Sequence, residues 1–315
     1  MTSYILRRIG SGLLLVWIVL TLIFLAIHAI PGDPAYQLAG GDTGVSKEGL
    51  EQIRDALGLN KPFAVQYGDY LGGVLTGDLG TSFSTGQAVS DAIADRLPVT
   101  LELIACAAVL SILIGLPFGA WAARRRGWAD TLLSGTTSVA LAVPVYVLGA
   151  VMVLLFAVTW RLLPAGGLPP FHTDPGAHIK QMIMPTVTLS LAFLSIVARM
   201  TRASVGETQR QDWVRTATSI GYPARVVFRN HVVRNSLTPV ITVIGLQIGT
   251  FLGSSVLIER VFNLPGMSSL LIDGVTHRDY PIVQGVVIVI SVLFVLINLA
   301  VDMVYGILDP RARQQ

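Results

Sequence analysis

Residues 282–308 have the sequence IVQGVVIVISVLFVLINLAVDMVYGIL, in which Asp302 is the single charged side chain. An α-helix needs about 20 consecutive apolar residues to cross the hydrocarbon core of a bilayer. This stretch is long enough and apolar enough to do so, and it lacks the charges that would oppose burial in lipid. It therefore predicts a transmembrane helix close to the C-terminal end of the chain.

Five other stretches have the same character, so we expect an all-α, polytopic membrane protein with six transmembrane helices. In chain order the six stretches are 9–30, 100–122, 132–158, 183–200, 237–258 and 282–308. The fourth is diluted by the hydroxyl side chains of Thr186, Thr188, Ser190 and Ser195. Because such hydroxyls bond within a helix or across helices, we expect this span to lie inside the bundle.

The composition agrees with a membrane protein. Of the 315 residues, 52% are hydrophobic and 13% are charged, whereas soluble domains carry roughly 25% charged residues. The formal net charge of +3 is small and does not indicate a nucleic-acid partner. The single cysteine, Cys106, lies in an apolar run and excludes a disulfide within the chain.

The basic residues predict the orientation of the chain, because cytoplasmic loops of membrane proteins are enriched in Lys and Arg. One side of the predicted spans receives most of the arginines, at 7–8, at 124–126, in the loop 201–236 and at the C-terminal end. Both termini are therefore expected in the cytoplasm, as an even number of spans requires. The first span is too long for a signal-peptide core and no A-x-A site follows it, so we expect it to be retained.

The spans divide the chain into three parts. Residues 1–30 hold the N-terminus and the first span, residues 31–98 form an external loop subdomain, and residues 99–315 form a five-helix core. The external loop is acidic, and the apolar residues of 63–75 recur at helical spacing. Its surface is either a solvated cover over the pore mouth or a docking surface for an external partner. The candidate docking residues are Asp42, Glu48, Glu51 and Asp55, with Arg260 and Arg278 from the loop around 259–280.

The internal loop at 201–236 is long, basic and helical in pattern. We expect a first helix over 211–220, a left-handed turn at Gly221, and a second helix with Pro223 in its first turn. The second helix should place Ala224, Val227, Phe228 and His231 on one face, because they follow the i, i+3, i+4, i+7 spacing.

Two small residues in this loop, Ala217 and Gly221, lie one helical turn apart and would let another surface approach the backbone. One interpretation is a helix-turn-helix that packs into a groove of a cytosolic partner. The other is an amphipathic helix that rests on lipid headgroups, which the arginines would favour, in a membrane receptor or scaffold.

The chain lacks the sequence motifs of an ATPase. A P-loop needs Lys followed by Ser or Thr, because the amine contacts phosphates and the hydroxyl contacts magnesium. The three lysines, Lys47, Lys61 and Lys180, are followed by Glu, Pro and Gln. There is also no H-E-x-x-H motif, and the five histidines are scattered. We therefore expect no catalytic residue, no metal site and no cofactor in this chain.

The segment DWVRTATSIGYPARVVFRNHVVRNSLTP at 212–239 resembles the EAA motif of ABC-importer permeases. The second alanine and the glycine of that motif match Ala217 and Gly221, while Thr216 precedes Ala217 in place of the motif's glutamate and alanine. This R-T-A variant is similar to the peptide-importer branch. The first span and the segments RLPVTLEL, ERVFNLPGMSSLLIDGVTHRDYPIVQG and LDPRAR resemble the dipeptide/oligopeptide (and nickel) permease family too, over essentially the whole chain.

The resemblance implies a type I ABC-importer permease fold with cytoplasmic coupling helices, in the permease with the longer first external loop. The expected partners are a second homologous permease, two ABC ATPase subunits that bind ATP and Mg²⁺, and an extracytoplasmic peptide-binding protein. The expected location is the bacterial cytoplasmic membrane. Short peptides are the expected substrate, and nickel chelates or glutathione are the alternatives within this family. The residues expected at the ATPase contact are Arg215, Thr216, Ala217, Gly221, Pro223, Asn235 and Pro239.

Overall fold

The computed structural model describes residues 2–29, 50–51, 54–55, 60–125 and 127–308. Within these ranges the regular structure is helical, and the one pairing between extended residues is an isolated bridge from Thr81 to Ala88. The all-α prediction is therefore confirmed. The described residues fall into two compact units. Unit 1 takes its residues from 1–8, 98–269 and 296–315, and unit 2 takes its residues from 9–97 and 270–295.

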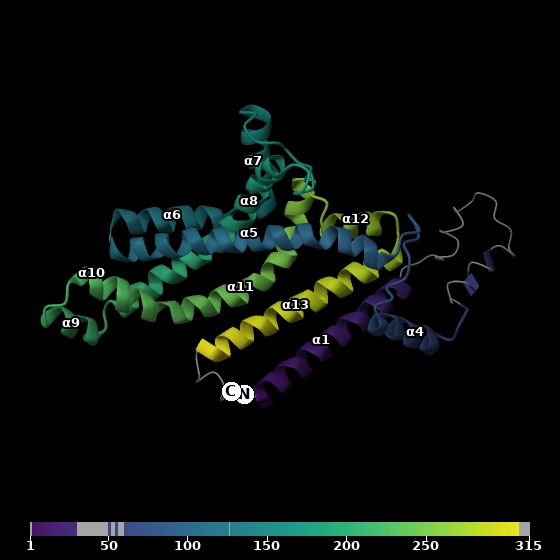
Figure 1. Ribbon diagram of the computed structural model, residues 1–315, viewed down its shortest axis with the longest axis horizontal. Helices are drawn as coiled ribbons and strands as arrows, with labels where there is room; N and C mark the ends of the chain where they lie inside the picture. Colours follow the sequence, from purple (N-terminus) through teal and green to yellow (C-terminus); the bar gives the residue numbers. More distant parts are fainter. Residues whose placement is uncertain (1, 30–49, 52–53, 56–59, 126, 309–315) are drawn as a thin grey trace. The chain divides into compact units, whose positions relative to one another are not determined.

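Five helices are long and apolar enough to cross a membrane, and they contain five of the six predicted spans (Figure 1). They are α1 (Thr2–Ala29), α5 (Val89–Arg124), α8 (Pro175–Thr208), α11 (Val233–Val261) with the helical turns before it, and α13 (Tyr280–Leu308). The remaining described helices are shorter. In the loops, α4 (Phe63–Thr76) confirms the predicted helical spacing, and α12 (Met267–Thr276) precedes α13.

The third predicted span, 132–158, is bent rather than one continuous helix, and it is the sixth candidate span if its two halves cross the membrane together. It consists of α6 (Trp128–Ala142), then α7 (Val145–Met152) and the π-helix η1 (Val153–Thr159), with a bend of 98° between the two halves. The break lies at Val143, whose φ of −92° and ψ of 127° are extended. The next residue is Pro144, whose ring disfavours a helical conformation in the residue before it.

The fourth span lies inside the bundle, as its hydroxyl content predicts. More than half of the apolar window of α8, 56%, is buried, against 11% to 33% for the other spans. Several of its hydroxyl groups donate to backbone carbonyls of the same helix, as Thr188 does to Met184 O at 2.8 Å and Ser195 to Leu191 O at 2.8 Å. These bonds satisfy those hydroxyls without a partner outside the helix, whereas Ser204 donates to Ser236 O of α11 at 2.8 Å.

Helices α5 and α8 approach each other closely within unit 1. A Cβ atom on Gly119 would overlap the carbonyl oxygen of Ala198, and one on Gly115 would lie 3.0 Å from Val197 Cγ1. The two glycines are one turn apart, which is the small-xxx-small spacing that lets transmembrane helices pack backbone to backbone. Ser111 adds a hydrogen bond between the helices, donating to Ser190 O at 3.1 Å.

In unit 2, α4 packs against the second half of α1 through an aromatic cluster. Phe24 is 3% exposed, and its ring lies 5.2 Å from the rings of both Phe63 and Tyr67. The hydroxyls of Thr21 and Tyr67 are hydrogen-bonded at 2.7 Å, and His28 Nε2 lies 3.1 Å from Gln66 Oε1. This packing joins part of the external loop to the first span.

Replacing Gly119 with Ala should destabilise the protein by about 1–3 kcal/mol, because the added methyl group forces α5 away from Ala198. Gly135 of α6 is the matched control, since a Cβ there meets nothing within 4 Å. Gly135→Ala should leave stability unchanged or raise it slightly. Thermal unfolding of the purified variants in detergent measures both, and equal midpoints for the two would contradict the close contact.

Candidate functional site

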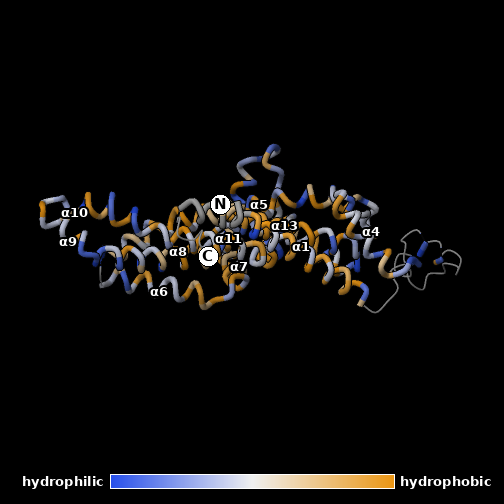
Figure 2. The backbone as a smooth tube through the Cα atoms, turned by 90° about the horizontal axis from the view of Figure 1, so that it is seen from below, coloured by the Kyte–Doolittle hydropathy of each residue, from blue (hydrophilic) through white to orange (hydrophobic). Residues whose placement is uncertain are grey.

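The internal loop forms a helical hairpin at the ends of α8 and α11 (Figure 1). Its first arm is α9 (Asp212–Ser219), which matches the helix predicted over 211–220. Its second arm begins with the short helix α10 (Ala224–Val226) and continues through the π-helix η2 (Val227–Val232) into α11. Hydrophilic and hydrophobic residues alternate along this hairpin (Figure 2).

Gly221 makes the turn between the two arms, as predicted. Its φ is +94°, in the region where residues with a Cβ atom are strained. The N–H of Gly221 donates to Thr218 O and the N–H of Tyr222 donates to Ala217 O, both at 3.2 Å. These two bonds form a Schellman motif, which satisfies the last carbonyls of α9. Pro223 precedes α10 directly, where its missing N–H costs no helical hydrogen bond.

One face of α9 packs onto the chain's own core. Val214 and Ala217 contact a buried cluster formed by Ala123 of α5, Val205 of α8, and Val227 and Val232 of η2. Ala217 is therefore half-buried against its own chain, and its small side chain lets α9 lie close to α5 and α8. One face of the hairpin is therefore packed on the core of its own chain.

The face predicted for the second arm is wrong in part. Val227 is buried and Phe228 is half-buried, but Ala224 and His231 are exposed. The reason is the π-helical turn, which contains more residues per turn than an α-helix and breaks the expected i+7 spacing. The buried pair in η2 is instead Val227 and Val232, five residues apart.

Four large apolar residues of the hairpin are exposed, namely Trp213, Ile220, Tyr222 and Val226, and sequence reasoning missed the two most exposed of them. Ile220 is 69% exposed and Tyr222 is 54% exposed, on either side of Gly221. Both are large and apolar. Their position beside a glycine that ends a helix was the sequence signal that could have predicted their exposure. Among the predicted contact residues, Arg215, Thr216 and Pro223 are also exposed.

The last two predicted contact residues, Asn235 and Pro239, lie on α11 rather than in the hairpin. Both are exposed, and Pro239 is inside the helix. The structure thus brings five of the seven predicted residues together in the hairpin. It places one of these five, Ala217, toward the chain's own core.

The predicted docking residues of the external loop have different surroundings. Asp42 and Glu48 lie outside the described residues. Glu51 is exposed and pairs with Arg54 at 3.0 Å, while Asp55 accepts a hydrogen bond from Asn60 at 2.6 Å.

The two basic docking residues belong to different units. Arg260 is exposed in the last turn of α11, in unit 1. Arg278 is exposed in unit 2, with a φ of +55°.

A carboxylate near Arg260 is turned inward. Glu259 has no exposed surface, and it accepts hydrogen bonds from the Thr100 hydroxyl at 2.6 Å and the Ser268 N–H at 2.8 Å. A Cβ atom on Gly266 would overlap this carboxylate. Glu259 therefore joins the end of α11 to α5 and to the start of α12, all within unit 1, and is not available to a partner.

Asp279 plays the matching role in unit 2. It is 2% exposed, and its Oδ2 accepts bonds from the Ser82 hydroxyl at 2.6 Å and from the Ser84 N–H and hydroxyl at 3.0 Å. Burial alone would raise the pKa of Asp279, but these hydrogen bonds outweigh it and lower the pKa. The carboxylate fixes the loop before α5 to the first turn of α13.

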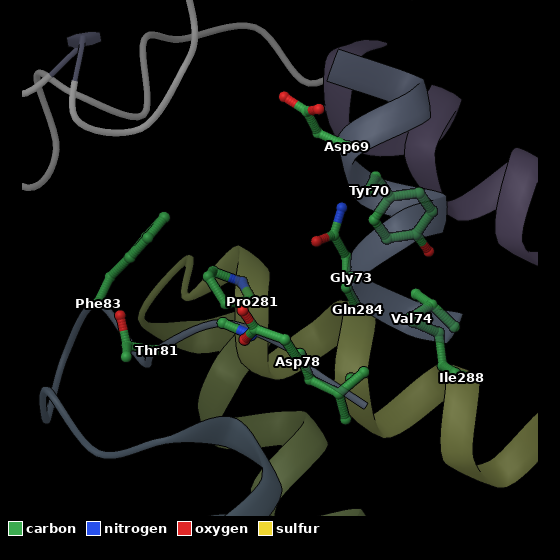
Figure 3. A pocket seen from close by; sticks show the side chains of 13 residues that line it. Asp69, Tyr70, Gly73, Val74, Asp78, Thr81, Phe83, Pro281, Gln284 and Ile288 are labelled. Carbon is green, nitrogen blue, oxygen red and sulfur yellow. The ribbon is translucent and has the colours of Figure 1, made fainter. Parts of the chain in front are cut away.

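A cavity of about 360 Å³ lies between α4 and the first turns of α13 in unit 2 (Figure 3). Asp69 and Tyr70 line it from α4, and Pro281, Gln284 and Ile288 line it from α13. The Tyr70 hydroxyl is buried without a hydrogen-bond partner, and burial, with a contribution from Tyr67, raises its pKa to about 12. Of the predicted docking residues that the structure describes, none lines this cavity.

Asp279→Asn should destabilise the protein by about 1.5–3 kcal/mol at neutral pH, because the charged acceptor of three hydrogen bonds is lost. The folded pKa of Asp279 is lower than the unfolded one, so its stabilisation is complete above about pH 4 and is lost as pH falls through the folded pKa. The difference between wild type and variant should therefore shrink on acidification, as measured by thermal unfolding across pH. The control, Asp91→Asn, changes an exposed carboxylate of α5 and should cost at most about 1 kcal/mol. A gap that stays constant down to the lowest pH would contradict the assignment.

The amino-acid sequence matches two family models in succession. Residues 115–314 match the family described as "Binding-protein-dependent transport system inner membrane component". Residues 1–104 match the family described as "Binding-prot-dependent transport system membrane comp, N-term". Together they cover the external loop and the hairpin, and the gap between them, 105–114, lies within α5.

Curated relatives align over nearly the full length. A putative peptide transport system permease protein of Brucella abortus is 40% identical over 99% of both chains. The dipeptide transport system permease protein of Escherichia coli is 36% identical over 100% of both chains. The glutathione transport system permease protein of Pectobacterium atrosepticum is 37% identical over 99% of both.

Proposed function

Since this chain belongs to the family of inner membrane components of binding-protein-dependent transport systems, we propose that it is one of two pore-forming subunits of an ATP-driven importer of short peptides. The observation that carries the proposal is the alignment, over full length, with permeases named for peptides and dipeptides. The six predicted spans and the hairpin at one end of unit 1 agree with that role. A stand-alone receptor or scaffold would not be expected to align with transport permeases over its whole length.

Glutathione is the second candidate substrate, because a glutathione permease is as similar as the dipeptide permease. Glutathione is itself a short peptide with a free amino group and carboxylates. The two substrates are therefore variants of one function rather than two mechanisms. None of the relatives named above is a nickel permease.

Energy for transport comes, in this proposal, from partner subunits. The chain has no lysine in a P-loop, so ATP and Mg²⁺ bind to two ABC ATPase subunits and this chain is not an enzyme. A second permease completes the pore, and an extracytoplasmic binding protein delivers the substrate. The arginine distribution supports a cytoplasmic position for both termini and for the hairpin, in the bacterial cytoplasmic membrane.

The hairpin is the proposed contact with the ATPase. Its inner face is packed on the chain's own core, so a push on α9 moves α5 and α8 with it. Its outer face presents Ile220 and Tyr222, together with Arg215, Thr216 and Pro223. Exposed apolar and aromatic side chains at the end of a helix are suited to anchor in a groove of a partner. Movement of the ATPase dimer would thus be transmitted to the spans.

Ile220→Ser should lower substrate-stimulated ATPase activity of the complex about tenfold, because an apolar anchor of the contact is lost. Unfolding of the chain should not change, since the side chain is 69% exposed. Ile179→Ser at the start of α8, 56% exposed, is the matched control and should keep normal activity. Wild-type coupling in the Ile220 variant would exclude this residue from the ATPase contact.

The function itself is tested by ATP-dependent uptake in liposomes that contain the complex purified with this chain. A labelled dipeptide should accumulate only with ATP and the binding protein, and unlabelled dipeptides should compete more strongly than glutathione. Stronger competition by glutathione than by dipeptides would make glutathione the preferred substrate. Uptake that persists without ATP, or purification of the chain without an ATPase, would overturn the proposal.

A further inference from the structure

A cavity of about 470 Å³ lies in unit 1 between the end of α5, the start of α6 and the last turns of α8. Small residues make room for it, among them Ala122, Ala203 and Gly206. A Cβ atom on Gly206 would meet nothing within 4 Å, so the space in front of this residue is open. The volume is in the range of small-molecule sites.

Two acidic and two basic side chains line this cavity. Arg202 and Asp130 form an ion pair at 2.5 Å that is about one-third to two-fifths exposed. The other oxygen of that carboxylate, Asp130 Oδ1, is buried without a hydrogen-bond partner. Glu207 and Arg210 also line the cavity. Both of these side chains are exposed, and neither has a hydrogen bond or ion pair with any residue that the structure describes. The cavity thus offers one buried carboxylate oxygen without a donor, Asp130 Oδ1, beside an exposed carboxylate and an exposed guanidinium.

The cavity is formed at the end of α5, the start of α6 and the end of α8, where the predicted spans are expected to reach the bilayer surface. Trp121 directly precedes the lining residue Ala122 in α5, and Trp128 is the first residue of α6. Trp121 and Trp128 make an edge-to-face contact at 5.2 Å, and Trp128 is 67% exposed. Tryptophan is enriched at the headgroup level of membranes, because its ring is apolar and its N–H is polar.

We propose that this cavity binds the headgroup of a phospholipid that carries both a primary ammonium and a phosphate, as phosphatidylethanolamine does. The ammonium donates hydrogen bonds to the carboxylates of Glu207 and Asp130. The phosphate accepts hydrogen bonds from the guanidinium groups of Arg210 and Arg202. This assignment gives Asp130 Oδ1 and the exposed Glu207 carboxylate a donor, and it gives the exposed Arg210 guanidinium an acceptor. It requires only that the spans lie in a bilayer, and it does not depend on the transported substrate.

Other headgroups fit less well. Phosphatidylcholine has the same charges, but its quaternary ammonium has no N–H to donate. Phosphatidylglycerol has no cation to face Glu207 and Asp130. A peptide with free ends carries the same pair of charges, but it has no acyl chains that would hold it beside exposed Trp128. These three molecules are therefore the discriminating competitors.

The test is native mass spectrometry of the full-length chain, purified in detergent and titrated separately with each of the three lipids. Wild type should retain one phosphatidylethanolamine about tenfold more tightly than phosphatidylcholine or phosphatidylglycerol, because charged hydrogen bonds of this strength are lost with either. Glu207→Gln and Arg210→Gln should each reduce that retention about tenfold. An alanyl dipeptide at millimolar concentration should not displace the lipid.

A cavity-filling variant separates this site from general lipid contact. Gly206→Leu leaves every charge in place but fills the cavity, so it should abolish the preference for phosphatidylethanolamine. Gly135→Leu, which adds the same side chain on the exposed face of α6, should keep it. Equal retention of the three lipids, an unchanged preference in Gly206→Leu, or displacement by the dipeptide would each overturn the proposal.

Discussion

The hydrocarbon core of the membrane contains no water, so each backbone N–H and C=O group within it must be hydrogen-bonded by the protein. The long helices of this chain meet that requirement along most of their length. Where a helix is interrupted, the cause is local, as at Val143 and Pro144, where a bend of 98° separates two short apolar halves. Thr188 and Ser195 of α8 follow the same rule, since their hydroxyls bond to carbonyls of their own helix. The loops, the hairpin and the contacts between helices are arranged around the long helices that this constraint requires.

Packing between those helices depends on the absence of side chains at a few points. Gly115 and Gly119 let α5 lie against the backbone of α8, and Ala217 lets α9 lie against the ends of the same two helices. The hairpin is therefore fixed to the bundle on one face and exposed on the other. In the proposed ATPase contact, a force on the exposed face of the hairpin would therefore be transmitted to the spans through the packed side chains of the other face.

Polar groups at the loops hold the ends of the helices. Glu259 and Asp279 are both buried carboxylates, and each accepts hydrogen bonds from hydroxyl and backbone donors that are distant in sequence. Neither is available to a partner, although both fall in a loop whose charge suggested an external contact. The Asp130 and Arg202 pair differs from them, because it leaves one buried carboxylate oxygen without a hydrogen-bond partner in an open cavity.

The sequence by itself determined the all-α membrane class, five of the spans, the turn at Gly221 and the likeness to importer permeases. These depend on local properties, namely the length of apolar runs and the conformations open to glycine and proline. Tertiary structure decided the rest: that Ala217 faces inward, that Ile220 and Tyr222 face outward, and that a π-helical turn shifts the buried face of the second arm to Val227 and Val232. The physical reason is that a side chain's burial depends on which helix lies against it, and a regular helical spacing does not reveal a π-turn or a neighbour far away in the chain.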